Sequence, residues 1–244
     1  GVSTSTVIRF CAQLGFDSYQ AFRDAFRADL SSTGVSRYGV DAKQLLRYSG
    51  TDSVGVLWNQ TTDNLVRRLV DTHNSVAASD LQRVAKTLRS ASRVGVLGFS
   101  GMFPAAFYLR YVLSYVLNEV RLFDDRMSTF LEDLPRFDRG DAVVIVSFEP
   151  YSADAVSVAN YCGDHRIPLV AVTDTPISPV ARSAKHVLLV PTTSTGFYQT
   201  LVPTLALFEG LIAYLVAEVG AEAVKRVERE FKRRDDLGMY WRAP

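Results

Sequence analysis

The chain has 244 residues, of which 48% are hydrophobic and 22% are charged, and its formal net charge at pH 7 is +1. This composition is typical of ordinary globular proteins, and the near-zero net charge excludes a chain that attracts polyanions over its whole surface. Any contact with nucleic acid must therefore come from a local patch.

Cysteine content and hydropathy bound the cellular setting. Cys11 and Cys162 are the only 2 cysteines, so we expect no disulfide scaffold and a reducing, cytoplasmic environment. The most apolar helix pattern, residues 201–216, is interrupted by Glu209 and is shorter than the roughly 20 residues that cross a bilayer. We therefore expect neither a signal peptide nor a membrane span.

Residues 1–30 are predicted to form two short helices. In the first helix apolar side chains from Val7 to Leu14 recur at helical spacing and form the packing face, which includes Phe10. Hydroxyl, amide and guanidinium groups remain on the opposite face, where they suit base edges in a major groove, although any surface helix has a polar face. The second helix, about residues 18–30, offers arginines to phosphates. The DNA-binding candidates are Ser5, Thr6, Arg9, Gln13 and Arg23.

The segment from Val2 to Arg23 reads VSTSTVIRFCAQLGFDSYQAFR. It resembles the recognition-helix half of the helix-turn-helix domain in MurR/RpiR-type transcriptional regulators, whose pattern is roughly V-S-x-A-T-V-x-R-F-C-x-x-L-G-F-x-G-Y-x-x-F. Ser5 stands where the family often has Ala, and Ser18 where it often has Gly. The resemblance implies that residues 1–30 are a partial DNA-binding domain and that its first two helices precede Gly1.

Residues 31–92 are predicted to link this module to a larger core. The stretch 31–53 is rich in Ser, Gly and Thr and indicates a hinge, with a short helical pattern at 41–48. Two longer helix patterns fill 54–92 and break near 77–80. Asp80 is a plausible cap for the second of them.

From residue 93 onward strand patterns alternate with helix patterns, which predicts right-handed crossovers and a parallel sheet covered on both faces. The predicted fold class is α/β, a five-stranded parallel sheet flanked by helices and preceded by the partial all-α module and the helical linker. A charged helix is expected at 222–234, and the aromatic end that follows it could dock on another subunit. The expected strands are 93–98, 119–123, 142–148, 168–173 and 186–190, and the expected helices are 103–118, 127–134, 152–164, 178–184 and 198–219.

Residues 93–219 resemble the SIS (sugar isomerase) domain, the usual partner of this helix-turn-helix in MurR/RpiR regulators. The similarity rests on Gly98-Phe99-Ser100-Gly101, on Val146-Ser147-Phe148-Glu149-Pro150-Tyr151-Ser152, and on Val172-Thr173-Asp174 with Ser178-Pro179. It implies a SIS domain at 93–220, a C-terminal helix and tail at 221–244, and a small-molecule effector. The implied ligand-binding residues are Ser100, Gly101, Ser147, Glu149, Ser152 and Thr173.

The third-strand loop departs from the family pattern S-x-S-G-x-T, which implies a sugar-phosphate cradle at a helix start. Glu149 replaces the middle Ser, and Pro150 replaces Gly and removes an N–H donor. A carboxylate about 4 Å from a phosphate charge costs on the order of 4 kcal/mol at an effective dielectric near 20. We therefore expect a non-phosphorylated polyol, sugar acid derivative or amino compound. Alternatively, Glu149 caps the following helix or pairs with a nearby Arg such as Arg126, and no ligand is involved. If an Arg neutralises Glu149 and also reaches the ligand site, phosphate binding becomes possible again.

These features favour a cytoplasmic transcriptional regulator without catalytic activity. Its expected partners are double-stranded operator DNA, a small carbohydrate-type effector and further copies of itself in a homodimer or tetramer. No cofactor is expected, since the three histidines have no metal-ligand spacing. One alternative is a sugar-phosphate isomerase whose base is Glu149, Glu209 or His186. Another is a regulator whose SIS domain binds no ligand and only dimerises.

Overall fold

The computed structural model describes residues 4–13, 16, 18–23, 38–50, 53–124 and 130–241. The chain divides into two compact units, one of residues 1–57 with 196–198 and the other of residues 58–195 with 199–244. The described residues of the first unit include helices, and the second unit contains the sheet. This order agrees with a helical region placed ahead of an α/β core.

The N-terminal unit holds α1 (Thr4–Gln13), helical residues at 19–23 and 38–44, and η1 (Leu45–Tyr48). Phe22 is the centre of an aromatic group, with its ring centroid 6.1 Å from that of Phe10 and 5.3 Å from that of Phe16. Cys11 is buried, whereas Phe10 is 52% exposed. The predicted packing face of the first helix is therefore only partly buried at Phe10. The Phe10 and Phe22 rings meet edge to face.

The second unit is built on a five-stranded parallel sheet in the order β2-β1-β3-β4-β5. Every residue of β1, β3 and β4 is buried, because helices cover both faces of the sheet and continuous Val, Leu and Ile runs suit that position. The predicted five-stranded parallel sheet is confirmed. The strands are β1 (Val94–Leu97), β2 (Val120–Phe123), β3 (Ala142–Val146), β4 (Leu169–Thr173) and β5 (His186–Leu189).

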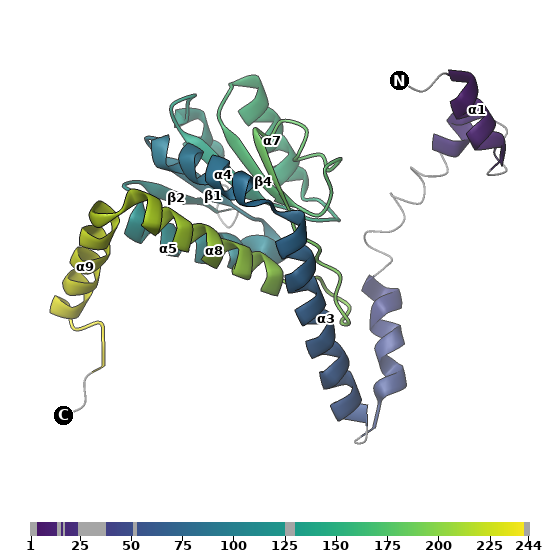
Figure 1. The fold of residues 1–244 in the computed structure, drawn as a ribbon, viewed down its shortest axis with the longest axis horizontal. Coiled ribbons are helices and arrows are strands. Elements are labelled where there is room, and N and C mark those ends of the chain that lie inside the picture. Colours follow the sequence, from purple (N-terminus) through teal and green to yellow (C-terminus); the bar gives the residue numbers. More distant parts are fainter. Residues whose placement is uncertain are drawn as a thin grey trace. The chain divides into compact units, whose positions relative to one another are not determined.

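Two hydrophobic cores lie on the two faces of this sheet. One contains residues of α4 (Ala78–Ser90), α5 (Phe103–Val116) and α8 (Val202–Val219). The other contains residues of α6 (Phe130–Asp133), η3 (Leu134–Arg136) and α7 (Ala153–Asp164). In Figure 1, α5 and α8 lie on one side of the strands and α7 lies on the other. The helices after β1 and β3 thus cover opposite faces.

Helix α8 is apolar because it is a core helix. By length and composition alone it could cross a membrane, with a mean hydropathy of 1.6 over 18 residues. Its side chains Leu207, Phe208, Leu211 and Leu215 are buried in the core beneath the sheet. Burial of this face accounts for part of the apolar composition of the helix.

The linking helices match their prediction closely. Helix α3 (Ser53–Ser75) and helix α4 are separated by a break at 76–77, near the predicted one. Asp80 helps to start α4 from its third position, where its carboxylate accepts the Ala77 amide at 3.1 Å. Helix α9 (Ala221–Asp236) follows α8 directly at Gly220, whose φ of 67° suits glycine.

The predicted helix at 178–184 is wrong, because turns occupy this segment. The amides of Ala181 and Ala184 bond to the carbonyls three residues before them, at 3.1 Å each, and Pro179 has no amide to donate. The helix predicted at 198–219 begins at Val202. Of the helix predicted at 127–134, residues 127–129 lie outside the described part of the chain.

Candidate functional site

The carboxyl ends of the strands bring three loops to one edge of the sheet. Leu97 at the end of β1 is level with Ile145 of β3, and Val146 is level with Val172 of β4. The chain leaves β1 for α5 on one face and leaves β3 for α7 on the other. The point between β1 and β3 is therefore the topological switch point, where open α/β sheets bind ligands.

The loop after β1 turns sharply. A Cβ atom at Gly98 would lie 2.7 Å from the Met102 carbonyl oxygen, so this position accepts only glycine while the loop keeps its path. Ser100 has a φ of 51° and starts the short η2 (Ser100–Met102). Ser100 is exposed and Gly101 is half-buried, so both expected ligand-binding residues are accessible at this edge.

The loop after β3 presents the remaining polar groups. Ser147 is buried at 3% exposure, whereas Glu149 and Ser152 are half-buried. Ser152 is the N-cap residue of α7, yet its side chain makes no capping hydrogen bond, so its hydroxyl is not used by the helix. The N-cap is therefore Ser152 and not Glu149, which corrects the capping alternative.

Asp174, which follows β4, fixes the loop after β3. Its Oδ1 accepts the Tyr151 hydroxyl at 2.7 Å and the Thr173 hydroxyl at 3.2 Å, and its Oδ2 accepts the Glu149 amide at 3.2 Å. Thr173 is fully buried. Thr173, one of the expected ligand-binding residues, donates its hydroxyl to Asp174 and so supports that carboxylate.

Two carboxylates act on Tyr151. Burial is the main cause that raises the pKa of Tyr151, followed by its hydrogen bond to Asp174 and by the charges of Asp174 and Glu149. Tyr151 therefore stays a neutral donor. Both carboxylates therefore lie close enough to Tyr151 to act on its phenol.

Glu149 is held through its backbone on both sides. Its amide donates to Asp174, and its carbonyl oxygen accepts a hydrogen bond from Gln199 Nε2. The alternative pairing of Glu149 with Arg126 lies outside the described residues, since the latter is not among them. Sequence reasoning missed Tyr151, Asp174 and Gln199 as site residues. A polar residue directly after a buried strand was the available signal for Asp174.

Four of the five DNA-binding candidates lie on one helix, and the fifth lies on the next helical segment. Ser5, Thr6, Arg9 and Gln13 are exposed on α1. Arg23 is half-buried in the helical turn at 19–23 and is less accessible than expected. The exposed polar face of α1 is therefore formed by Ser5, Thr6, Arg9 and Gln13.

Of the three bases proposed for an isomerase, His186 lies away from this edge. His186 starts β5 at the opposite end of the sheet, where its Nε2 is 2.9 Å from the Thr87 hydroxyl oxygen. Its pKa is lowered, first by burial and then by the charges of Lys185 and Arg83. Glu209 is exposed on α8, and its charge adds to burial in raising the pKa of Tyr108 on α5.

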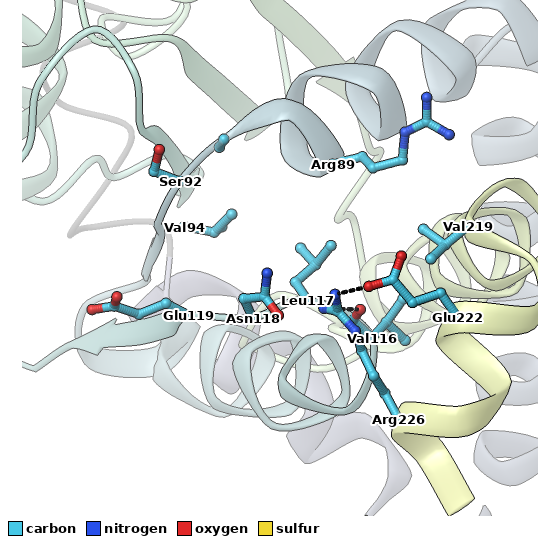
Figure 2. Close-up of a pocket in the computed structure, with 11 residues that line it drawn as sticks. Arg89, Ser92, Val94, Val116, Leu117, Asn118, Glu119, Val219, Glu222 and Arg226 are labelled. Atoms are coloured by element: carbon cyan, nitrogen blue, oxygen red, sulfur yellow. Dashed lines mark hydrogen bonds and ion pairs between the residues drawn. The ribbon is translucent and has the colours of Figure 1, made fainter.

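A pocket of about 300 Å³ lies at the amino edge of the sheet, beside Val94 (Figure 2). Helices α4, α5 and α8 all end here, and their last carbonyls carry partial negative charge. Arg226 donates to the Val116 carbonyl at 3.3 Å and pairs with Glu222, and Arg89 donates to the Glu218 carbonyl at 3.3 Å. Arginines thus neutralise helix ends, and this pocket is separate from the switch point.

The geometry agrees with a family model for the SIS domain, which matches residues 87–214, and the chain belongs to the SIS domain family. The sugar isomerase domain of an RpiR transcription factor from Sphaerobacter thermophilus is 26% identical, with a TM-score of 0.66 over 71% of this chain and 97% of that chain. The Vibrio vulnificus NanR protein complexed with ManNAc-6P is 22% identical, with a TM-score of 0.65 over 97% of this chain and 82% of that chain.

An HTH-type transcriptional regulator from Thermotoga maritima is 21% identical over 193 residues, which are 79% of this chain. The chain spans 66% of the length of that relative. Similarity to regulators therefore extends well beyond the residues that the SIS model matches.

Proposed function

We propose that this protein is a DNA-binding transcriptional regulator whose SIS domain senses a small carbohydrate-type metabolite. The observation that carries the proposal is that a SIS domain follows an N-terminal helical unit in the same chain. A regulator of known structure is similar in fold across 97% of this chain. The exposed polar face of α1, with Arg9 and Gln13, suits contact with base edges.

The proposed division of labour follows the predicted domains. Residues 1–30 read DNA, residues 31–92 link the modules, residues 93–220 form the sensing domain, and residues 221–244 form a terminal helix and tail. Paired helix-turn-helix modules require two half-sites about one helical turn apart, so the regulator works as a homodimer or tetramer. Its place of action is the cytoplasm, where the operator DNA is.

The proposed effector is a carbohydrate derivative without a phosphate. The carboxylates of Glu149 and Asp174 both act on Tyr151, and Pro150 offers no amide. Hydroxyl and amine groups are the natural partners of such a site, whereas a doubly charged phosphate meets repulsion. The NanR protein was solved with a phosphorylated sugar, whereas we propose an effector without a phosphate for this protein. The choice between the two classes of effector is therefore the part of the proposal to test first.

Two assays on the whole protein test the proposal. A mobility-shift titration with DNA from around the protein's own gene, at low and physiological salt, tests DNA binding. A thermal-shift screen then compares each free sugar with its phosphate, beginning with N-acetylmannosamine and its 6-phosphate. We expect a specific DNA shift and stabilisation by free sugars. Absence of DNA binding at low salt would contradict the regulator, and stabilisation by phosphates alone would contradict the effector class.

The isomerase alternative has less support. His186 lies at the far edge of the sheet, which leaves Glu149 and Glu209 as the remaining bases among those considered. Turnover of a sugar phosphate in a coupled assay would revive this alternative. A SIS domain that only dimerises is favoured instead if no sugar of either class shifts the melting temperature while the DNA shift persists.

A further inference from the structure

The loop between β5 and α8, residues 190–201, is bonded to two separate parts of the second unit. At one end of it, Gln199 donates its side-chain amide to the Glu149 carbonyl in the loop after β3. Near its middle, the Thr195 and Thr61 hydroxyl oxygens are 2.9 Å apart, which joins it to α3. One loop therefore touches both the candidate site and the linking helix.

This loop is closed on itself. The Thr200 amide donates to the Thr192 carbonyl at 3.1 Å, which ties together the two ends of the segment 193–199. Thr192 is 9% exposed and so anchors the closure in the body of the unit. A short segment closed in this way is expected to shift as one piece, so a movement of Gln199 is passed to Thr195.

Little of helix α3 is buried in the described part of the chain. Of its 23 residues, only Thr72 is buried in the described structure. Trp58, Val66 and Val70 are exposed at 69%, 54% and 53%. A helix with so little buried surface opens locally at low cost, and the hydrogen bond between Thr61 and Thr195 helps to fix it.

We propose that residues 190–201 relay the state of the effector site to α3, with Gln199 as the positioning residue of the site and the Thr195–Thr61 pair as the output. This inference rests on the proposed function, in which the candidate site binds an effector. A ligand that moves the loop after β3 shifts the Glu149 carbonyl, and Gln199 follows its acceptor. Since α3 is continuous from Ser53, it carries the change toward the N-terminal unit. Such coupling acts equally in both directions.

Hydrogen exchange on the whole chain, without DNA or sugar, tests the relay. The variant Gln199→Met removes the donor at similar size, and we expect amides of α3 around Thr61 to exchange about fivefold faster, as the loss of one hydrogen bond implies. The variant Thr61→Val removes the other bond, and we expect the same direction of change in residues 147–152. The double variant should add little to either, because both cut one path.

A matched control lies one residue away on the same helix. Thr62 donates its hydroxyl to the Trp58 carbonyl within α3 at 3.0 Å, so Thr62→Val changes the helix without touching the loop. The relay is overturned if faster exchange stays confined to the substituted segment, or if Thr62→Val affects residues 147–152 as much as Thr61→Val does. Because neither ligand nor DNA is present, this outcome is independent of the DNA and sugar assays that test the regulator itself.

Discussion

Tyr151 donates its hydroxyl to Asp174 Oδ1 over 2.7 Å, from the loop after β3 to the residue that follows β4. The same carboxylate also accepts the Glu149 amide. Neighbouring strand ends are thereby joined through one acidic side chain. The position of Glu149 at the candidate site is consequently set by Asp174 and not by the loop sequence alone.

Removal of the phenol should loosen this arrangement. We expect Tyr151→Phe to lower the free energy of unfolding by about 1 kcal/mol, the usual net worth of one such hydrogen bond. For a domain of this size the melting temperature falls by about 2–4 °C, which calorimetry resolves. Tyr161→Phe on α7 is the control, because its ring stacks on His165 and the described residues include no partner for its hydroxyl. An equal loss in both variants would contradict the role of Tyr151.

The charge of Glu149 should set the preference between free and phosphorylated sugars. Glu149→Gln keeps the size and the backbone bonds and removes the negative charge, so affinity for a sugar phosphate should rise by about tenfold to a hundredfold relative to the free sugar. Calorimetric titration of wild type and variant with N-acetylmannosamine and its 6-phosphate measures this ratio. An unchanged ratio would show that the carboxylate does not face the ligand.

The sheet was predictable because β1, β3 and β4 are buried on both faces and read as continuous apolar runs, for example Ala142–Val146. The turns at 178–184 were not, since periodicity alone did not reveal that the amides of Ala181 and Ala184 bond only three residues back. Thr173 illustrates the limit at the site: a hydroxyl after a strand looks the same in sequence whether it meets a ligand or a neighbouring carboxylate. Gln199 is 50 residues from its partner, so only tertiary packing brings the two together.

Asp141 should control stability in acid. Its side chain is 1% exposed and accepts Arg93 Nε at 3.0 Å and Arg93 Nη2 at 2.6 Å. Burial alone would raise its pKa, but the bonds from Arg93 and the Asp138 amide outweigh burial and hold the pKa below its usual value. This contribution is therefore present above the unfolded-state pKa of about 3.9 and is lost as the pH falls through the lower folded-state value.

Asp141→Asn should cost about 3 kcal/mol at pH 7, because it leaves Arg93 without its charge partner. Below about pH 4 the free energy of unfolding of the variant should also fall less steeply with pH than that of the wild type. Urea denaturation at several pH values measures both effects. Asp71→Asn is the control, since Asp71 pairs with Arg68 on the surface with 47% of its side chain exposed, and such pairs are worth about 1 kcal/mol or less. Identical acid limbs in wild type and Asp141→Asn would refute the assignment.

Cys162 should be inert in the folded protein. It is fully buried, and burial raises its pKa to about 12, so the reactive thiolate is scarce at neutral pH. We expect iodoacetamide at pH 8 to label Cys162 only when urea unfolds the chain, as followed by mass spectrometry of its peptide. Equal labelling rates with and without urea would mean that α7 opens readily from the sheet.

The exposed face of α1 should determine DNA affinity. Arg9→Ala removes a guanidinium from the face that also carries Gln13, so affinity for the specific DNA should fall by about tenfold or more at physiological salt. Arg67→Ala is the matched control. Arg67 is exposed on α3, outside the proposed reading face, and its substitution removes the same charge. Fluorescence anisotropy across a salt series separates the two effects. If both variants weaken binding equally, the loss reflects net charge, and α1 is not the reading helix.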